Sequence, residues 1–218
     1  RTRDAYPILM DGLHRLEYRG YDSAGCALIN EDSKGKPKGL AIYKAKGKVS
    51  DLEAIADKQN VSGTLGIAHT RWATHGVPSE VNAHPHVSQS GNLTLVHNGI
   101  IENYVALRTQ LEAKGFVFKS QTDTEVLVQL IEYTMNVSNE DLATSVRKAL
   151  SKVIGAYAIC VIDRRHPEQL VAARKSSPMV VGVVPDNSEF FIASDASPIA
   201  LYTKQMVYLN DEGVVVCE

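Results

Sequence analysis

Short strand-like runs recur along the chain and are separated mostly by turn residues rather than by long helices. Five such runs follow one another in the C-terminal part, at residues 156–162, 169–173, 179–184, 189–194 and 205–209. Parallel strands need crossover connections of a dozen or more residues, and few segments here are long enough to supply them. The pattern therefore predicts antiparallel or mixed sheets with helices packed outside them, an α+β fold.

The charge balance excludes several classes of partner. The 218 residues include 23 Lys and Arg against 25 Asp and Glu, a formal net charge of −2. A generally basic surface is absent, so we expect neither nucleic acid nor an acidic membrane as a partner. No apolar run approaches the roughly 20 residues that a membrane-spanning helix needs. With no internal repeat and no long linker, residues 1–218 are expected to form a single domain.

The cysteines indicate where the protein resides. Cys26, Cys160 and Cys217 are too few and too scattered to form a disulfide framework. Free cysteines fit a reducing compartment, and the chain opens at Arg1 without a signal-like apolar segment. We therefore expect a cytoplasmic protein.

Most of the histidines gather in one short window, which also holds the only tryptophan. A metal site needs at least three converging ligands, but the window has no Cys, a single acid (Glu80), and neither an HExxH nor a CxxC motif. The favoured interpretation is that these imidazoles form hydrogen bonds that hold loops in shape, and we expect no metal and no cofactor. The window contains the histidines His69, His75, His84, His86 and His97 and the tryptophan Trp72.

Three further positions each admit two interpretations. Asn98-Gly99 is typical of a plain turn, but it lies where strand periodicity gives way to helix periodicity, and the two donors there could face an oxyanion. Asp123 could simply complement the free N–H groups of a helix start. Arg71-Trp72 could bind a carboxylate bidentately beside an indole wall, or form a surface ion pair. Residue patterns alone indicate a small-molecule site with anion recognition.

Five motifs, in order, closely resemble the glutamine:fructose-6-phosphate aminotransferase (glucosamine-6-phosphate synthase) family, over nearly the whole chain. They are LEYRGYDSAG (16–25), HTRWATHG (69–76), NAHPH (82–86), HNGIIEN (97–103) and TDTE (122–125). The similarity corresponds to the N-terminal class II glutaminase domain of that family. It implies an N-terminal-nucleophile (Ntn) hydrolase fold, with two antiparallel sheets between helix layers in an αββα arrangement.

The resemblance also implies a reaction. An N-terminal cysteine attacks the side-chain amide of L-glutamine, its own α-amino group acts as the base, and a thioester releases ammonia before water releases L-glutamate. The ammonia aminates fructose 6-phosphate in hexosamine biosynthesis. The alternatives are the glutaminase domain of another class II enzyme, such as amidophosphoribosyltransferase, or a non-catalytic amino-acid-binding domain.

By the same resemblance, each site residue receives a role. Asn98 and Gly99 would form the oxyanion hole. Arg71 would hold the α-carboxylate of glutamine and Asp123 its α-ammonium. The glutamine pocket would be lined by Trp72, Thr74 and His75. Arg19 would help to order the surroundings of the nucleophile.

The chain departs from the family pattern at its beginning. The family begins with the nucleophilic cysteine and a short strand, whereas this sequence begins at Arg1, at a position that corresponds to the end of that strand. None of the three cysteines present has the free α-amino group that the reaction needs. We therefore expect the nucleophile to precede Arg1 and a chain without it to be inactive. The family also continues into a C-terminal sugar isomerase domain, and the full enzyme is expected to be a homodimer.

Overall fold

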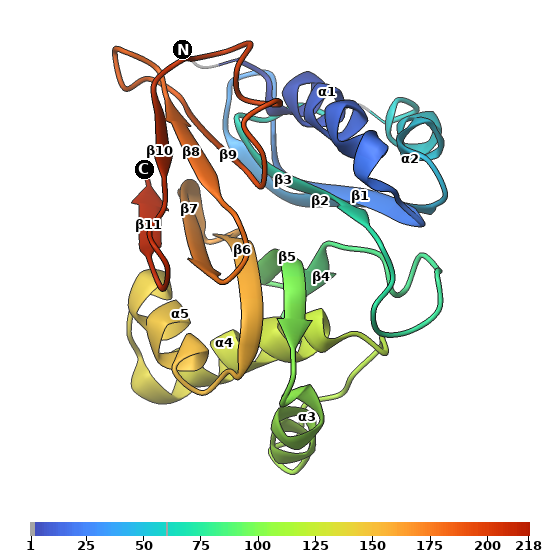
Figure 1. Cartoon of the computed structure of the whole chain (residues 1–218), viewed down its shortest axis with the longest axis vertical. Helices are drawn as coiled ribbons and strands as arrows, with labels where there is room; N and C mark the ends of the chain where they lie inside the picture. The colour runs from blue at the N-terminus through green and yellow to red at the C-terminus, as the bar shows by residue number, and fades with distance from the viewer. Residues whose placement is uncertain (1–2, 60) are drawn as a thin grey trace.

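The computed structural model describes residues 3–59 and 61–218 (Figure 1). The helices are α1 (Ala5–Leu16), η1 (Glu17–Arg19, a 3₁₀ helix), α2 (Val49–Ala56), α3 (Tyr104–Glu112), α4 (Asp123–Ser138) and α5 (Leu142–Leu150). The strands are β1 (Ser23–Glu31), β2 (Pro37–Lys46), β3 (Leu65–Arg71), β4 (His86–Val87), β5 (Leu93–Ile101), β6 (Gly155–Asp163), β7 (His166–Lys175), β8 (Val180–Val183), β9 (Phe190–Ala193), β10 (Met206–Tyr208) and β11 (Val214–Cys217).

The named strands pair only in antiparallel fashion, and they form three hydrogen-bonded groups. The orders are β2-β1-β3, β10-β8-β9 and β11-β7-β6-β5-β4. Four pairs of consecutive strands, β1-β2, β4-β5, β6-β7 and β8-β9, are sheet neighbours joined by short connections, as expected when hairpins rather than crossover helices connect strands. The α+β fold expected from the sequence is confirmed.

The elements stack in four layers (Figure 1). Helices α1 and α2 cover the outer face of the β1–β3 sheet, while α4 and α5 cover the far face of the five-stranded sheet. Between the two sheets, Ile29 and Ile67 from the first pack with Val96 and Ile162 from the second. Each sheet therefore buries apolar side chains on both faces, which explains why so many strand residues are apolar throughout rather than alternating.

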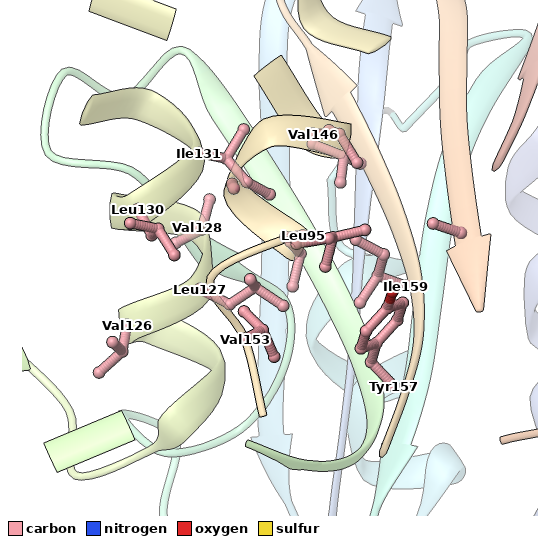
Figure 2. Close-up of a cluster of buried hydrophobic side chains, with 14 of the residues drawn as sticks. Leu95, Val126, Leu127, Val128, Leu130, Ile131, Val146, Val153, Tyr157 and Ile159 are labelled. Atoms are coloured by element: carbon pink, nitrogen blue, oxygen red, sulfur yellow. The ribbon is translucent and has the colours of Figure 1, made fainter. Parts of the chain in front are cut away.

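The largest core lies between the five-stranded sheet and its helices. Figure 2 shows Leu127 and Ile131 of α4 and Val146 of α5 directed toward Leu95 and Ile159 of the sheet. Helix α4 is buried over most of its length, and its first turn begins at the N-cap residue Thr122, whose side chain accepts a hydrogen bond from the backbone of Glu125. This core fixes where α4 starts, and its start faces the end of β5.

Two features of the chain differ from the sequence-based expectation. Strand β5 continues to Ile101, so Asn98 and Gly99 lie within a strand that pairs with β6, and helix α3 starts only at Tyr104. The expected strand-to-helix junction at Asn98-Gly99 is therefore wrong, because pairing with β6 extends the strand across the Asn-Gly pair. Strand β4 was not expected, because two residues are too few to show a strand pattern in the sequence.

The buried face of α4 gives a stability prediction. Leu127 is 1% exposed and Val137, on the same helix, is 68% exposed. Leu127→Ala should lower the free energy of unfolding by about 2–5 kcal/mol, because it removes buried methyl groups and leaves a cavity. Val137→Ala is the control and should change it by about 0.5 kcal/mol or less. Urea denaturation measures both, and equal effects would contradict the packing described.

Candidate active site

Segments from both sheets and from α4 surround one cavity of about 220 Å³. The end of β3 and the loop after it form one wall, the end of β5 another, and the first turn of α4 a third. Its lining residues are Arg19, Gly20, His69, Thr70, Arg71, Trp72, Thr74, His84, His97, Asn98, Gly99, Thr122, Asp123 and Thr124.

The structure brings together nearly all the residues singled out from the sequence. Arg71 and Trp72, Asn98 and Gly99, and Asp123 come from three segments far apart in sequence, and all line this cavity, together with Thr74 and Arg19. His75 is the exception: it is not part of the lining. Its Nδ1 lies 3.6 Å from Oδ1 of Asp123, and its ring packs edge-on against Tyr104.

Arg71 presents an unpaired donor in a buried position. The residue is 4% exposed, and its Nη2 donates to the backbone carbonyls of His75 and Gly76. Its Nη1 is buried and has no hydrogen-bond partner in the described part of the chain, the nearest carboxylate oxygen being Oδ1 of Asp22 at 3.8 Å. An unpaired buried guanidinium nitrogen is costly, so this donor is suited to an anion entering the cavity. Because Nη2 already donates to two backbone carbonyls, a carboxylate would accept a hydrogen bond from Nη1 alone and would not bind both nitrogens bidentately.

Asp123 places a carboxylate at the start of α4. The residue is 3% exposed, and its Oδ2 accepts the backbone N–H of Ile101 at 2.8 Å. The carboxylate therefore lies at the N-terminal end of α4, where the free backbone N–H groups and the positive end of the helix dipole are found. The cavity therefore has a fixed cation on one wall and a fixed anion on another.

Gly99 allows the end of β5 to lie very close to β6. Its φ is +128°, and a Cβ added there would lie 2.2 Å from the carbonyl oxygen of Ala156. Any side chain would push the two strands apart. Beside it, the Oδ1 of Asn98 lies 2.6 Å from Nε2 of His69, so strands from both sheets contact each other at the cavity.

Two residues outside the predicted set hold the loop after β3. The backbone N–H of Ala73 donates to the carboxylate of Asp22. The indole of Trp72, which is 69% exposed, lies so close to Gly20 that a Cβ there would be 2.5 Å from Cζ3. Both residues fall within the LEYRGYDSAG motif, which could have indicated them, although it does not show what they contact.

The clustered histidines form the loop-fixing hydrogen bonds expected of them. His86 Nε2 lies 3.0 Å from Oγ1 of Thr122, and His97 Nδ1 lies 3.0 Å from Oγ1 of Thr124. Burial lowers the pKa of His69 to about 4, lowers the pKa of His97, and holds the pKa values of His84 and His86 well below the usual range. No group of three or more His, Cys, Asp and Glu side chains in residues 3–59 and 61–218 is arranged to hold a metal ion.

The three cysteines are free thiols outside this cavity. Burial raises the pKa of Cys26 and of Cys160 to about 12 and also raises that of Cys217. A thiol attacks as the thiolate, so these groups are poor nucleophiles at neutral pH.

A second, larger cavity of about 430 Å³ adjoins the first. It is lined by β3 and β9, which are end strands of their sheets in the described residues, and by parts of α1, β6 and β7. The two cavities share Arg19, His69, Thr70, His97 and Asn98. The groove therefore leads along the free edges of two strands directly to Asn98.

Comparison with known proteins agrees with this geometry. Residues 69–200 match the family described as glutamine amidotransferase domain. The chain belongs to the glutamine amidotransferase domain family. This family match begins at His69 and includes Arg71, Asn98 and Asp123, so the cavity described above lies largely within the matched segment.

Several relatives share one name, glutamine–fructose-6-phosphate aminotransferase (isomerizing). That of Bacteroides thetaiotaomicron is 61% identical over 214 residues, covering 98% of this chain and 34% of the relative. That of Chlorobaculum tepidum is 52% identical over 221 residues, and the match also covers 98% of this chain and 34% of the relative. The chain therefore spans about a third of the length of these relatives.

A solved structure of glutamine phosphoribosylpyrophosphate amidotransferase from B. subtilis is also similar. It superimposes with a TM-score of 0.76 at 26% identity, covering 99% of this chain and 47% of that one. The expected Ntn amidotransferase fold is thereby confirmed. No helix in the described residues is both long and apolar enough to cross a membrane.

The buried histidines predict a loss of stability in mild acid. Below about pH 6.5 the unfolded chain binds protons on these imidazoles, while folded His69, with a pKa of about 4, does not. Folding therefore opposes protonation, and stability falls as the pH drops from about 6.5 toward 4. His69 alone should lower the free energy of unfolding by about 2 kcal/mol between pH 7 and pH 5.

Urea denaturation at the two pH values measures this loss. His84 and His86 act in the same direction, because their folded pKa values are also lowered. The His69→Gln variant, which cannot titrate at this position, should show a smaller difference between the two pH values. An equal unfolding free energy at pH 7 and pH 5 would contradict the neutral, buried histidines.

Proposed function

We propose that this chain is the glutaminase domain of a glutamine:fructose-6-phosphate aminotransferase, which hydrolyses L-glutamine and supplies ammonia for the amination of fructose 6-phosphate. The observation that carries the proposal is the pairing, in one small cavity, of the free Arg71 Nη1 with the buried Asp123 carboxylate. A zwitterionic amino acid needs one fixed cation and one fixed anion on either side of its Cα. The high identity to relatives of that name supports the choice of enzyme.

In the proposed complex, the α-carboxylate of glutamine accepts from Arg71 Nη1 and its α-ammonium donates to Asp123. The side-chain amide then extends toward Asn98 and Gly99, whose donors would stabilise the oxyanion. Trp72 and Thr74 line the same cavity and would contact the bound glutamine. His75 would act through its contact with Asp123 rather than by touching glutamine.

The nucleophile, in this proposal, is the first residue of a segment that precedes Arg1. Strands β3 and β9 each have an edge unpaired by any other described strand, and both edges line the groove that leads to Asn98. Unpaired strand edges favour the addition of another strand. A strand in the groove would pair with both β3 and β9 and carry its cysteine to the cavity. Arg19, which lines both cavities, would lie beside it.

The proposed reaction proceeds in two steps. The α-amino group of the cysteine takes the thiol proton, the thiolate sulfur bonds to the amide carbon of glutamine, and the C–N bond breaks as ammonia leaves with that proton. Water then adds to the thioester carbon, the C–S bond breaks, and glutamate leaves as the thiol is restored. Asn98 and Gly99 would hold the oxyanion in both steps.

The remaining parts of the proposal concern the whole polypeptide. Residues 1–218 would form one domain, and the rest of the relatives' length would include a sugar isomerase domain fused after it. The full enzyme would be a cytoplasmic homodimer. The alternative of an amidophosphoribosyltransferase has less support, because the sequence identity to the solved structure of that enzyme is 26%, against 61% to the Bacteroides thetaiotaomicron relative.

Product analysis tests the proposal. The natural polypeptide, with its cysteine-led segment, should convert glutamine into glutamate and ammonia in a 1:1 ratio. Replacing that cysteine by serine should reduce turnover to background, because the thiolate is lost. Cys26→Ala should retain turnover, since Cys26 lies in the core outside both cavities. Binding of glutamine without hydrolysis by the unmodified polypeptide would favour a non-catalytic amino-acid-binding domain instead.

Arg71→Lys tests the role of the free guanidinium nitrogen. Lysine cannot both bond the carbonyls of His75 and Gly76 and reach the α-carboxylate, so KM for glutamine should rise about 10- to 100-fold, as for loss of one charged hydrogen bond. Steady-state kinetics measures this change. Arg15→Lys, which alters only a surface pair with Asp11, is the matched control. A KM within twofold of the unmodified enzyme would remove Arg71 from substrate binding.

A further inference from the structure

One short contact joins the two sheets at the proposed oxyanion site. His69 belongs to β3 and Asn98 to β5, and the distance from His69 Nε2 to Asn98 Oδ1 is 2.6 Å. Both residues line the site cavity and the groove beside it. His69 thus contacts the residue whose side chain would stabilise the transition state.

An asparagine amide has an accepting end and a donating end. When Oδ1 accepts from a neighbour on one side, Nδ2 with its two hydrogens must face away from that neighbour. An oxyanion is stabilised only by the donating end, and the accepting end would repel it. Whatever holds Oδ1 therefore decides whether Asn98 helps or hinders the reaction.

We propose that His69 is a positioning residue: by donating its Nε2–H to Oδ1 of Asn98, it turns the Asn98 amide nitrogen toward the cavity as the oxyanion donor. This inference rests on the proposed glutaminase function for its consequence in catalysis. The hydrogen bond itself is a property of the chain and can be tested without turnover.

The surroundings of His69 favour the tautomer that the proposal needs. Its Nδ1 is buried and has no hydrogen-bond partner in the described residues, so a proton there would be an unpaired buried donor. A proton on Nε2 instead forms the bond to Asn98. The ring is stacked on His84, with centroids 4.2 Å apart, which holds its plane.

The imidazole also stays uncharged near neutral pH. The pKa of His69 is lowered to about 4, chiefly by burial and also by the nearby His97, Arg71 and Arg19, while the hydrogen bond to Asn98 acts in the opposite direction. A neutral ring with its proton on Nε2 has one donor and directs it at Oδ1. The opposite tautomer would accept from Asn98, and the amide would then present its oxygen to the cavity.

¹⁵N NMR spectroscopy tests the hydrogen bond by identifying which ring nitrogen of His69 carries the proton. In the chain labelled with ¹⁵N-histidine, long-range ¹H–¹⁵N correlations distinguish the two tautomers and the cation. We expect His69 to carry its proton on Nε2 from pH 7 down to about pH 5, consistent with its lowered pKa. A proton on Nδ1, or a charged ring at pH 7, would overturn the proposal.

Kinetics of the natural polypeptide tests the consequence. His69→Leu removes the donor and should lower kcat about 100-fold, the effect of losing one oxyanion donor, with little change in KM. His69→Gln keeps an N–H donor near the Nε2 position and should recover most of kcat. His14→Leu, which removes hydrogen bonds to Glu17 and Glu53 on the distant α1 face, is the control and should leave kcat unchanged.

A double-mutant cycle separates positioning from a structural role. If His69 acts through the Asn98 amide, then His69→Leu should cost less than about threefold in kcat when combined with Asn98→Ala. A full loss in the Asn98→Ala background, or a His69→Gln variant as slow as His69→Leu, would contradict the proposal. Thermal melts of each variant exclude unfolding as the cause.

The two proposals fail in different ways. If the natural polypeptide does not hydrolyse glutamine, the proposed function is wrong, while the NMR result still decides whether His69 orients Asn98. If glutamine is hydrolysed and the tautomer is the opposite one, only the role of His69 is wrong.

Discussion

The geometry of the site depends on the first turn of α4, where four consecutive side chains bond to other segments. Thr122 bonds to His86, Asp123 to the backbone of Ile101, Thr124 to His97, and Glu125 to the backbone of Lys119 and Ser120. A helix start usually needs acceptors for its own free N–H groups. Here the same short segment also joins β4, β5 and the preceding loop. Because the rest of α4 is buried in the largest core, this turn cannot shift without disturbing that core.

The second constraint is the face-to-face packing of the two sheets. Arg71 and His69 come from one sheet and Asn98 from the other, so no single sheet contains the site. Apolar residues such as Ile67 and Val96, close to these positions in sequence, hold the sheets together. Apolar packing thus sets the distances between polar groups, and the charges themselves need contribute little to folding.

Much of the fold and of the residue set was predictable from the sequence, but the contacts were not. Strand-like runs and turn residues predicted an α+β fold, and the ordered motifs predicted the family. Local periodicity could not show that β5 continues through Gly99, because that depends on pairing with β6, more than 50 residues later in the sequence. Nor could it show that Arg71 uses one nitrogen to hold its own loop, or that His69 meets Asn98 across the sheets.

The raised pKa values of the cysteine thiols have a practical consequence for chemical labelling. Alkylating reagents react with thiolates, and a thiol with a pKa of about 12, as for Cys26 and Cys160, is ionised to about one part in 100,000 at pH 7. An ordinary thiol, with a pKa of about 8.5, is ionised to about 3%. An exposed cysteine joined to this domain would therefore react about 3,000-fold faster than Cys26 and Cys160. Because the pKa of Cys217 is also raised, one exposed cysteine joined to the domain could be labelled in preference to all three of these thiols, without removing them.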